Sequence, residues 1–204
     1  MNNYIKIGFK PCPKCGSENI SCWAFNLAPD CGAECLDCGH TIELEVEWEG
    51  DEYKDGMTPA VAKNILFESG FGDNNDLRSS AVMKRLKKEV LPKICMIVGE
   101  ENVCTFPTDL TTWDGLKPYG VMEDKISIPS MDFYRANVEL FDKYPVSDWW
   151  WLATPESAPP HGSSNWILCV SPSGGIYGDN YFCNYGGVRP ILYFKSSIFG
   201  SLEN

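Results

Sequence analysis

The sequence predicts an α+β protein in which a small metal-stabilised module precedes a larger domain. Six of the ten cysteines stand within the first 40 residues, which is the pattern of a metal site. In the middle of the chain apolar residues recur at helical spacing, and the last third contains short β-favouring runs between Gly- and Ser-rich turns. A chain of 204 residues is long enough for one such domain with a small attachment.

The N-terminal module contains two C-x-x-C-G knuckles, at residues 12–16 and 35–39. A spacing of two residues lets both thiolates bind one ion, and the following glycine can adopt the positive φ that turns backbone amides toward the sulfurs. Four thiolates complete a tetrahedral zinc shell and leave no open coordination position. We therefore expect one structural zinc ion, and its ligands are Cys12, Cys15, Cys35 and Cys38.

Three further residues near the knuckles could bind metal, namely Cys22, Cys31 and His40. A second zinc ion would need four additional ligands, and the sequence does not offer a convincing set. We expect Cys22 and Cys31 to be small, partly buried residues and His40 to be a turn residue.

Residues 1–49 are expected to form a zinc ribbon, with one strand near residues 19–25 and another at 41–49. In the second strand, apolar residues at the even positions alternate with glutamates at 43, 45, 47 and 49. We expect this glutamate face to be solvated, and it would repel phosphate groups. Residues 50–57 are acidic and contain two glycines, which is typical of a linker, so the larger domain is expected over residues 58–204.

Three helices are expected in the first part of the larger domain. Thr58 and Pro59 suit an N-cap and a first helical position, and would begin a short helix that ends before Gly70. A second helix is expected to begin at Ser79 or Ser80 and to stop at Pro92. A third is expected between Ser130 and Pro145. Its inner side would carry Phe133, Tyr134, Val138 and Phe141.

The outer face of the second helix carries the single basic cluster in the chain, which consists of Lys84, Arg85, Lys87 and Lys88. These side chains could contact a phosphate backbone or an acidic partner, but the interpretation we favour is a solvated helix face. The formal net charge of −11 has the wrong sign for a protein that binds nucleic acid with its whole surface.

Short strands are expected at residues 148–153, 166–170, 175–177 and 188–194. Trp149, Trp150 and Trp151 alternate across the first of these strands, so at least one should face the core. Arg189, in the last strand, is expected to form a structural ion pair. The loop between the third and fourth strands is rich in Tyr, Asn and Gly, which favours adaptable recognition. The candidate ligand-binding residues there are Asp179, Asn180, Tyr181, Asn184 and Tyr185. The alternative is an ordinary hairpin whose aromatic side chains pack inward.

No catalytic constellation is evident, and we do not expect an enzyme. The two histidines, His40 and His161, stand in no recognised catalytic motif, and the sequence contains no phosphate-binding glycine motif. Calcium-dependent sugar binding is not expected, because the tripeptides that usually supply its oxygen ligands are absent. A thiol-dependent oxidase would have to use Cys169 or Cys183, and neither has a Lys or Arg beside it in sequence.

The segment from Lys10 to Ser17 resembles the zinc ribbons of the restriction alleviation (Lar-like) family, which open with a Lys-Pro-C-P-x-C-G-S knuckle. The resemblance covers about residues 9–48. It implies a zinc-ribbon fold with the same four cysteine ligands and an association with the modulation of host restriction.

The larger domain resembles a bacterial and phage domain of unknown function that has a WWL-x-(S/T)-P…GVRP signature, here at residues 150–155 and 187–190. The segments 71–76, 109–116 and 134–135 also look like versions of it, so that the resemblance extends over about residues 57–196. The order of helices, WWL strand, glycine turn and closing GVRP strand is similar to the C-type lectin-like fold, and this similarity implies the fold alone.

Together these observations lead us to expect a non-enzymatic, phage-encoded accessory protein whose C-type lectin-like domain binds a ligand or a host or phage protein. The alternative is a nucleic-acid-associated or anti-restriction (anti-defence) protein, and the weaker alternative is the thiol-dependent oxidase. The start of the chain lacks the apolar segment of a secretion signal, and no stretch is apolar enough to span a membrane. A cytoplasmic location, the host cytoplasm for a phage protein, is therefore expected.

Overall fold

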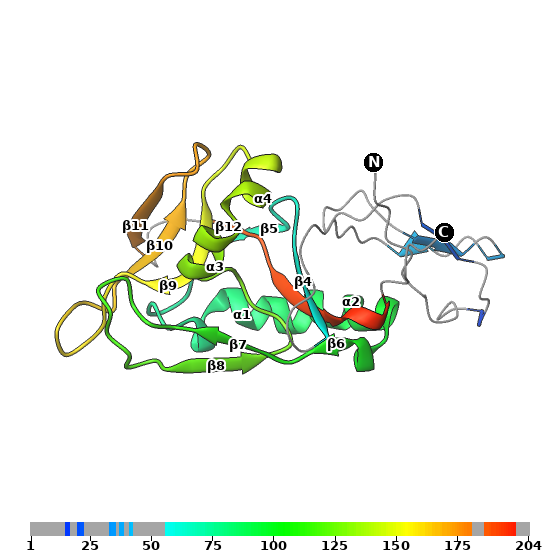
Figure 1. Ribbon diagram of the computed structural model, residues 1–204, viewed down its shortest axis with the longest axis horizontal. Helices are drawn as coiled ribbons and strands as arrows, with labels where there is room; N and C mark the ends of the chain where they lie inside the picture. The colour runs from blue at the N-terminus through cyan, green and yellow to red at the C-terminus, as the bar shows by residue number, and fades with distance from the viewer. Residues whose placement is uncertain are drawn as a thin grey trace.

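The computed structural model in Figure 1 describes residues 15–16, 20–22, 33–35, 37–38, 41–42, 56–180 and 186–198. Residues 56–180 and 186–198 form a mixed α+β domain with three sheets and a helix of 18 residues. Among the described residues, no helix combines the length and the apolar character that crossing a membrane requires.

The strands of this domain are β4 (Met57–Val61), β5 (Phe67–Ser69), β6 (Val103–Cys104), β7 (Phe106–Asp109), β8 (Val121–Asp124), β9 (Trp150–Pro155), β10 (Trp166–Val170), β11 (Ile176–Asn180), β12 (Gly186–Val188) and β13 (Ile191–Lys195). The helices are η1 (Leu77–Ser79), α1 (Ala81–Arg85), η2 (Leu86–Val90), α2 (Leu91–Val98), η3 (Glu100–Asn102), α3 (Met131–Ala136), α4 (Val138–Lys143) and η4 (Ser196–Ile198).

The largest sheet has the strand order β11-β10-β9-β12-β5, and β9 lies parallel to β12 while the other pairs are antiparallel. A second sheet has the order β4-β13-β6, and β7 and β8 form a separate two-stranded sheet. The segments that carry the WWL and GVRP motifs meet in the largest sheet, because Gly187 of β12 is in register with Trp150 of β9. Residues far apart in the sequence therefore form its central strands.

Strand β9 is buried along its whole length, because helices cover both faces of the sheet. On one face Trp151 packs in a cluster with residues of the long helix, including Leu86 and Ile94. On the other face Trp150 packs with Tyr134 of α3 and Phe141 of α4. The prediction that at least one tryptophan faces the core is confirmed, and two of the three do so. The sheet thus lies between two apolar layers.

The long helix begins where the sequence predicts, at Ala81, because the Ser80 hydroxyl caps it by accepting a hydrogen bond from the Met83 N–H at 3.0 Å. The predicted stop at Pro92 is wrong. Residues Leu86–Val90 form a π turn, in which the Leu91 N–H reaches the Leu86 carbonyl, and the helix then continues to Val98 with Pro92 in its first turn. This wider turn accommodates a proline that lacks an N–H, so the chain keeps its direction.

The helix predicted to begin at Thr58 is also wrong, since Met57–Val61 forms strand β4. Strand β4 pairs along its whole length with β13, and its Thr58, Ala60 and Val61 are buried. Pro59 is tolerated because β4 is an edge strand of its sheet, where a missing N–H need not interrupt a ladder. Long-range pairing therefore prevails over a local helix-start signal.

The helix predicted between Ser130 and Pro145 consists of two short helices, α3 and α4, separated at Asn137. Ser130 is the predicted cap and accepts from the Phe133 N–H at 3.2 Å. Tyr134 and Phe141 are buried as expected, whereas Val138 is 41 % exposed. The break at Asn137 changes the direction of the chain, so Val138 leaves the inner face.

The described N-terminal residues include three short strands, β1 (Ile20–Cys22), β2 (Ala33–Cys35) and β3 (Thr41–Ile42), in one antiparallel sheet. Strands β1 and β3 fall within the segments predicted to be strands. The glutamates at 43, 45, 47 and 49 and most of the predicted linker lie outside the described residues.

Candidate functional site

An exposed aromatic pair, Trp149 and Tyr177, stands at the edge of the five-stranded sheet. The two rings are in contact, with their centroids 5.1 Å apart and their planes at 66°. Trp149 is 40 % exposed and Tyr177 is 53 % exposed, although large aromatic side chains are usually buried. Tyr177 lies directly opposite Cys169, which in turn lies opposite Trp151, so strand pairing places Tyr177 on the Trp151 face of the sheet. We call Trp149 and Tyr177 the aromatic surface.

The aromatic surface adjoins the loop that the sequence identifies as a recognition loop. Of the five candidate residues there, Asp179 and Asn180 end strand β11, where both are half-buried and the Asn180 N–H donates to the Asp179 carboxylate at 2.7 Å. Tyr181, Asn184 and Tyr185 lie outside the described residues. Tyr177 starts this segment, and its ring does not pack inward, in contrast to the alternative hairpin interpretation.

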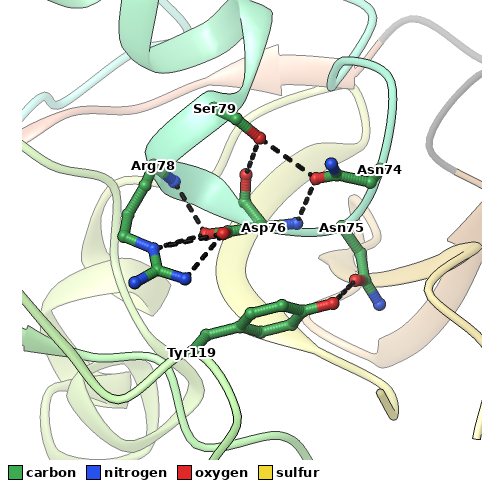
Figure 2. A network of polar contacts seen from close by, with 6 residues as sticks. All are labelled: Asn74, Asn75, Asp76, Arg78, Ser79 and Tyr119. Carbon is green, nitrogen blue, oxygen red and sulfur yellow. Dashed lines mark hydrogen bonds and ion pairs between the residues drawn. The ribbon is translucent and has the colours of Figure 1, made fainter. Parts of the chain in front are cut away.

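A second group of side chains joins three loops at residues 73–79, 110–120 and 155–166. Its centre is Asn75, which is fully buried. The Asn75 amide donates to the backbone carbonyls of Ser157 at 2.9 Å and Trp166 at 2.8 Å, and its oxygen accepts from the Tyr119 hydroxyl at 2.8 Å. Figure 2 shows the Tyr119 hydroxyl directed at Asn75. One side chain therefore fixes all three loops.

The network continues on the exposed side of the same loop (Figure 2). The Arg78 guanidinium forms a bidentate pair with Asp76 at 2.9 and 2.7 Å and lies over the Tyr119 ring. The hydrogen bond from Arg78 to Asp76 raises the pKa of the guanidinium further above its ordinary value. The Asn74 side chain accepts from the Asp76 N–H and the Ser79 hydroxyl. These groups satisfy one another, so we interpret the network as a structural one.

The loop at residues 112–116 packs against the end of β9. The Asp114 carboxylate accepts hydrogen bonds from the Ser157 hydroxyl at 2.6 Å and the Thr112 hydroxyl at 2.5 Å. These two bonds, first that of Ser157, lower the pKa of Asp114 below its ordinary value. Its neighbour Trp113 is 57 % exposed. Sequence reasoning singles out neither residue as a binding residue.

The basic helix face is largely committed to contacts within the protein. Arg85 pairs with Glu89 at 2.8 Å and lies 4.0 Å from the centroid of the Phe67 ring. Lys87 pairs with Asp124 of β8. Lys84 and Lys88 are exposed. Two of the four basic side chains therefore already have acidic partners, in accordance with the interpretation as a solvated, charge-balanced face.

Arg189 is structural, but the expected ion pair is not what binds it. The side chain is 2 % exposed, and its guanidinium donates to the backbone carbonyls of Ala62 at 3.0 Å and Lys63 at 2.8 Å. It lies over the rings of Phe141 and Trp150, with centroid distances of 5.0 and 5.2 Å. Burial lowers the pKa of Arg189 to about 10, so the group remains charged near neutral pH.

The cysteine residues divide between the two parts of the chain. Cys15 and Cys38 lie in turns, and Gly16 has the positive φ of 73° that a C-x-x-C-G knuckle requires. Cys35 belongs to strand β2, while Cys12, Cys31 and His40 lie outside the described residues. The zinc site, with Cys12, Cys15, Cys35 and Cys38 as its ligands, therefore stays a prediction.

The candidate catalytic thiol Cys169 is 2 % exposed in the core and donates weakly to the Tyr177 carbonyl at 3.4 Å. Burial, with a smaller contribution from Asp179, raises the pKa of Cys169 to about 12. A thiol in that state is protonated near neutral pH and is a poor nucleophile. Cys183 lies outside the described residues, and His161 is exposed in the loop before β10.

No protein-family model matches the sequence, and searches of curated proteins and of solved structures also find no match.

Proposed function

We propose that this chain is a non-enzymatic accessory binding protein that recognises a host or phage protein through its aromatic surface and the adjoining loop. The observation that carries the proposal is the solvent-exposed contact between Trp149 and Tyr177. Paired aromatic residues that remain exposed on a folded surface are enriched at protein interfaces, where tryptophan and tyrosine often dominate the binding energy. The chemistry of the neighbouring loop agrees, because Asn, Gly and Tyr provide adaptable contacts.

The two rings can provide enough binding energy to matter. Aromatic side chains have roughly 150–250 Å² of surface, so covering the exposed part of each ring would remove roughly 80 Å² or more from water. At about 25 cal/mol per Å², each ring contributes on the order of 2 kcal/mol. Loss of both would then reduce affinity by roughly a thousandfold, before the loop residues are counted.

We further propose that the larger domain has a C-type lectin-like fold and that residues 1–49 form the zinc ribbon. The pairing of β9 with β12 supports the first proposal, because it brings the two halves of the WWL…GVRP signature together. The antiparallel order β1-β2-β3 and the positive φ of Gly16 support the second. In this arrangement zinc would be bound by Cys12, Cys15, Cys35 and Cys38 and would stabilise a module whose core is small.

The binding proposal can be tested by affinity capture followed by a direct measurement. Tagged wild-type protein is exposed to lysate of the host, captured proteins are identified by mass spectrometry, and each is then purified and titrated by calorimetry. The matched variants are Trp149→Ala with Tyr177→Ala, and Met96→Ala as a control. Met96 is a similarly exposed large apolar residue, at 50 %, on helix α2 and outside the aromatic surface.

We expect the double variant to lose at least tenfold in affinity for the purified partner while Met96→Ala binds that partner as the wild type does. Near-UV circular dichroism of each variant shows whether its tertiary packing is retained. An affinity that is unchanged in a folded double variant would eliminate the aromatic surface as the binding site. In that case a second double variant, Tyr181→Ala with Tyr185→Ala, tests the loop separately.

A further inference from the structure

Two other exposed tryptophans lie on chain segments that flank the end of β9. The Trp113 N–H donates to the Pro155 carbonyl at 2.8 Å, and the Glu156 N–H donates to the Trp166 carbonyl at 3.1 Å. Neighbouring hydrogen-bonded backbones are about 4.8 Å apart, so the backbones of Trp113 and Trp166 are separated by roughly 10 Å. Trp113 is 57 % exposed and Trp166 is 41 % exposed. The two tryptophans therefore belong to backbone segments on either side of the end of β9.

The carboxylate of Glu156 lies over the same face of the β10–β11 hairpin as Trp166. Trp166 is opposite Asn180 and Leu168 is opposite Gly178, so the side chains at positions 166 and 178 share a face. A Cβ atom built at Gly178 would be only 3.0 Å from the Glu156 Oε1 atom. The carboxylate therefore occupies the space that a side chain at 178 would fill, on the face of the hairpin that carries Trp166.

Two acidic residues, Asp114 and Glu156, lie close in the chain to these tryptophans. Within residues 56–180 and 186–198, neither Asp114 nor Glu156 takes part in an ion pair. The bonds from Ser157 and Thr112 hold the Asp114 carboxylate in place and favour its ionised form. The chain as a whole has a formal net charge of −11. Two carboxylates that have no ion pair among the described residues thus lie on the same loops as two exposed tryptophans, and Asn75 joins these loops.

We propose that this acidic tryptophan surface, formed by Trp113, Asp114, Glu156 and Trp166, binds a Lys- or Arg-containing segment of a partner protein. An ammonium or guanidinium group is attracted both to the face of an indole ring and to a carboxylate, and this surface offers the two together. A neutral sugar could stack on an indole ring, but it would gain nothing from the unpaired charges. Charge complementarity therefore selects a cationic occupant.

This surface is distinct from the aromatic surface. Trp166 and Cys169 are three residues apart in β10, so their side chains point to opposite faces of the sheet, and Tyr177 shares the face of Cys169. The experiment for this surface therefore uses defined peptides and does not depend on the outcome for Trp149 and Tyr177.

The test is a calorimetric titration of the full-length protein with blocked hexapeptides that alternate glycine with arginine, lysine or glutamate, and with a neutral glucose hexamer. We expect the arginine and lysine peptides to bind, with an affinity that falls at least fivefold between about 50 and 300 mM salt because exposed charges are screened. We expect no binding of the glutamate peptide or the sugar. Glu156→Gln and Trp166→Ala should each lower the affinity at least fivefold, while Met96→Ala, at an exposed residue of helix α2, should change it less than twofold.

Three results would overturn the proposal: equal binding of the lysine and glutamate peptides, binding of the sugar alone, or absence of binding by every probe. An unchanged affinity in Glu156→Gln would do so as well. That variant is nearly isosteric, and it keeps the backbone bond from residue 156 to Trp166, so it is expected to fold. The peptide affinity of Glu156→Gln therefore tests the proposal even if Trp166→Ala fails to fold.

Discussion

Replacement of Asn75 by alanine should be among the most damaging single substitutions in the larger domain. The side chain is fully buried and makes three hydrogen bonds, two as donor to the carbonyls of Ser157 and Trp166 and one as acceptor from Tyr119. Each such bond is worth about 1 kcal/mol net, and a buried group left without its partner costs about 1–3 kcal/mol. The two carbonyls dominate, because the half-exposed Tyr119 hydroxyl can turn to water. We expect a loss of about 3–4 kcal/mol.

The assay is equilibrium unfolding in urea, monitored by tryptophan fluorescence. With a slope of about 2 kcal/mol per molar urea for a domain of this size, the midpoint should fall by roughly 1.5–2 M at an unchanged slope. The matched control is Asn165→Ala, at an exposed asparagine in the loop before β10, and it should stay within about 0.5 kcal/mol of the wild type.

A second variant distinguishes the donor role of Asn75 from simple loss of volume. Asn75→Asp keeps the shape and the acceptor for Tyr119, but a carboxylate cannot donate to the two carbonyls. It should be at least as unstable as Asn75→Ala at pH 7, and it should recover as the pH falls, because only the protonated acid can donate. A loss below about 1 kcal/mol in Asn75→Ala, or an aspartate variant as stable as the wild type at pH 7, would refute this account of the loop anchor.

Three further predictions concern the metal, the buried thiol and the basic helix face. Elemental analysis of freshly purified protein should find about one zinc ion per chain. The Cys35→Ser variant should lose the metal and the Cys22→Ser variant should retain it. Wild-type protein without metal would contradict the zinc-ribbon prediction. The pKa of the Cys169 thiol is about 12 in the folded protein, whereas an unperturbed thiol has a pKa near 9. As the pH rises, the unfolded chain therefore loses this proton before the folded protein does. The free energy of unfolding should therefore fall between pH 9 and 12 more steeply in the wild type than in Cys169→Ala, and parallel pH profiles in urea titrations would contradict this. The anti-restriction alternative requires that the protein binds DNA at low salt. It also requires that the double variant Lys84→Glu with Lys88→Glu no longer binds DNA. Because Arg85 and Lys87 are already paired, we expect fluorescence anisotropy to detect no such binding at about 50 mM salt, and steeply salt-dependent binding would restore that alternative.

Local signals in the sequence predict the elements of this domain best where few alternatives compete. Strand β10 occupies the predicted residues, and Ser80 and Ser130 cap helices as their residue types indicate. Each of these features depends on a few consecutive residues, namely a run of β-favouring side chains or a hydroxyl that can accept from an N–H two or three positions later.

The errors arise where a distant partner decides the conformation. Thr58 and Pro59 have the local chemistry of a helix start, but pairing with β13 places them in a strand. Pro92 has the local chemistry of a helix stop, but a π turn absorbs it, and buried Ile94 and Ile97 continue the apolar stripe. In both cases burial against residues remote in sequence prevails over a preference of the order of 1–3 kcal/mol.

The candidate surfaces were only partly predictable for the same reason. The composition of the loop after β11 indicates recognition and draws attention to that region, but nothing in the sequence pairs Tyr177 with Trp149. Asn75 is one of several polar residues in its loop, and its partners are 82 and 91 residues away. A single sequence contains no signal for bonds of that range.

The position of β13 has a consequence for the order in which the chain can acquire structure during synthesis. This strand lies between β4 and β6, and β12 lies between β9 and β5, so the last part of the domain to be translated supplies an inner strand to two sheets. At 5–20 residues per second, the ribosome exposes β4 and β5 roughly ten seconds before their partners emerge. During that interval neither strand has its native hydrogen-bonding partner, so the two sheets can be completed only after residue 195 has left the exit tunnel.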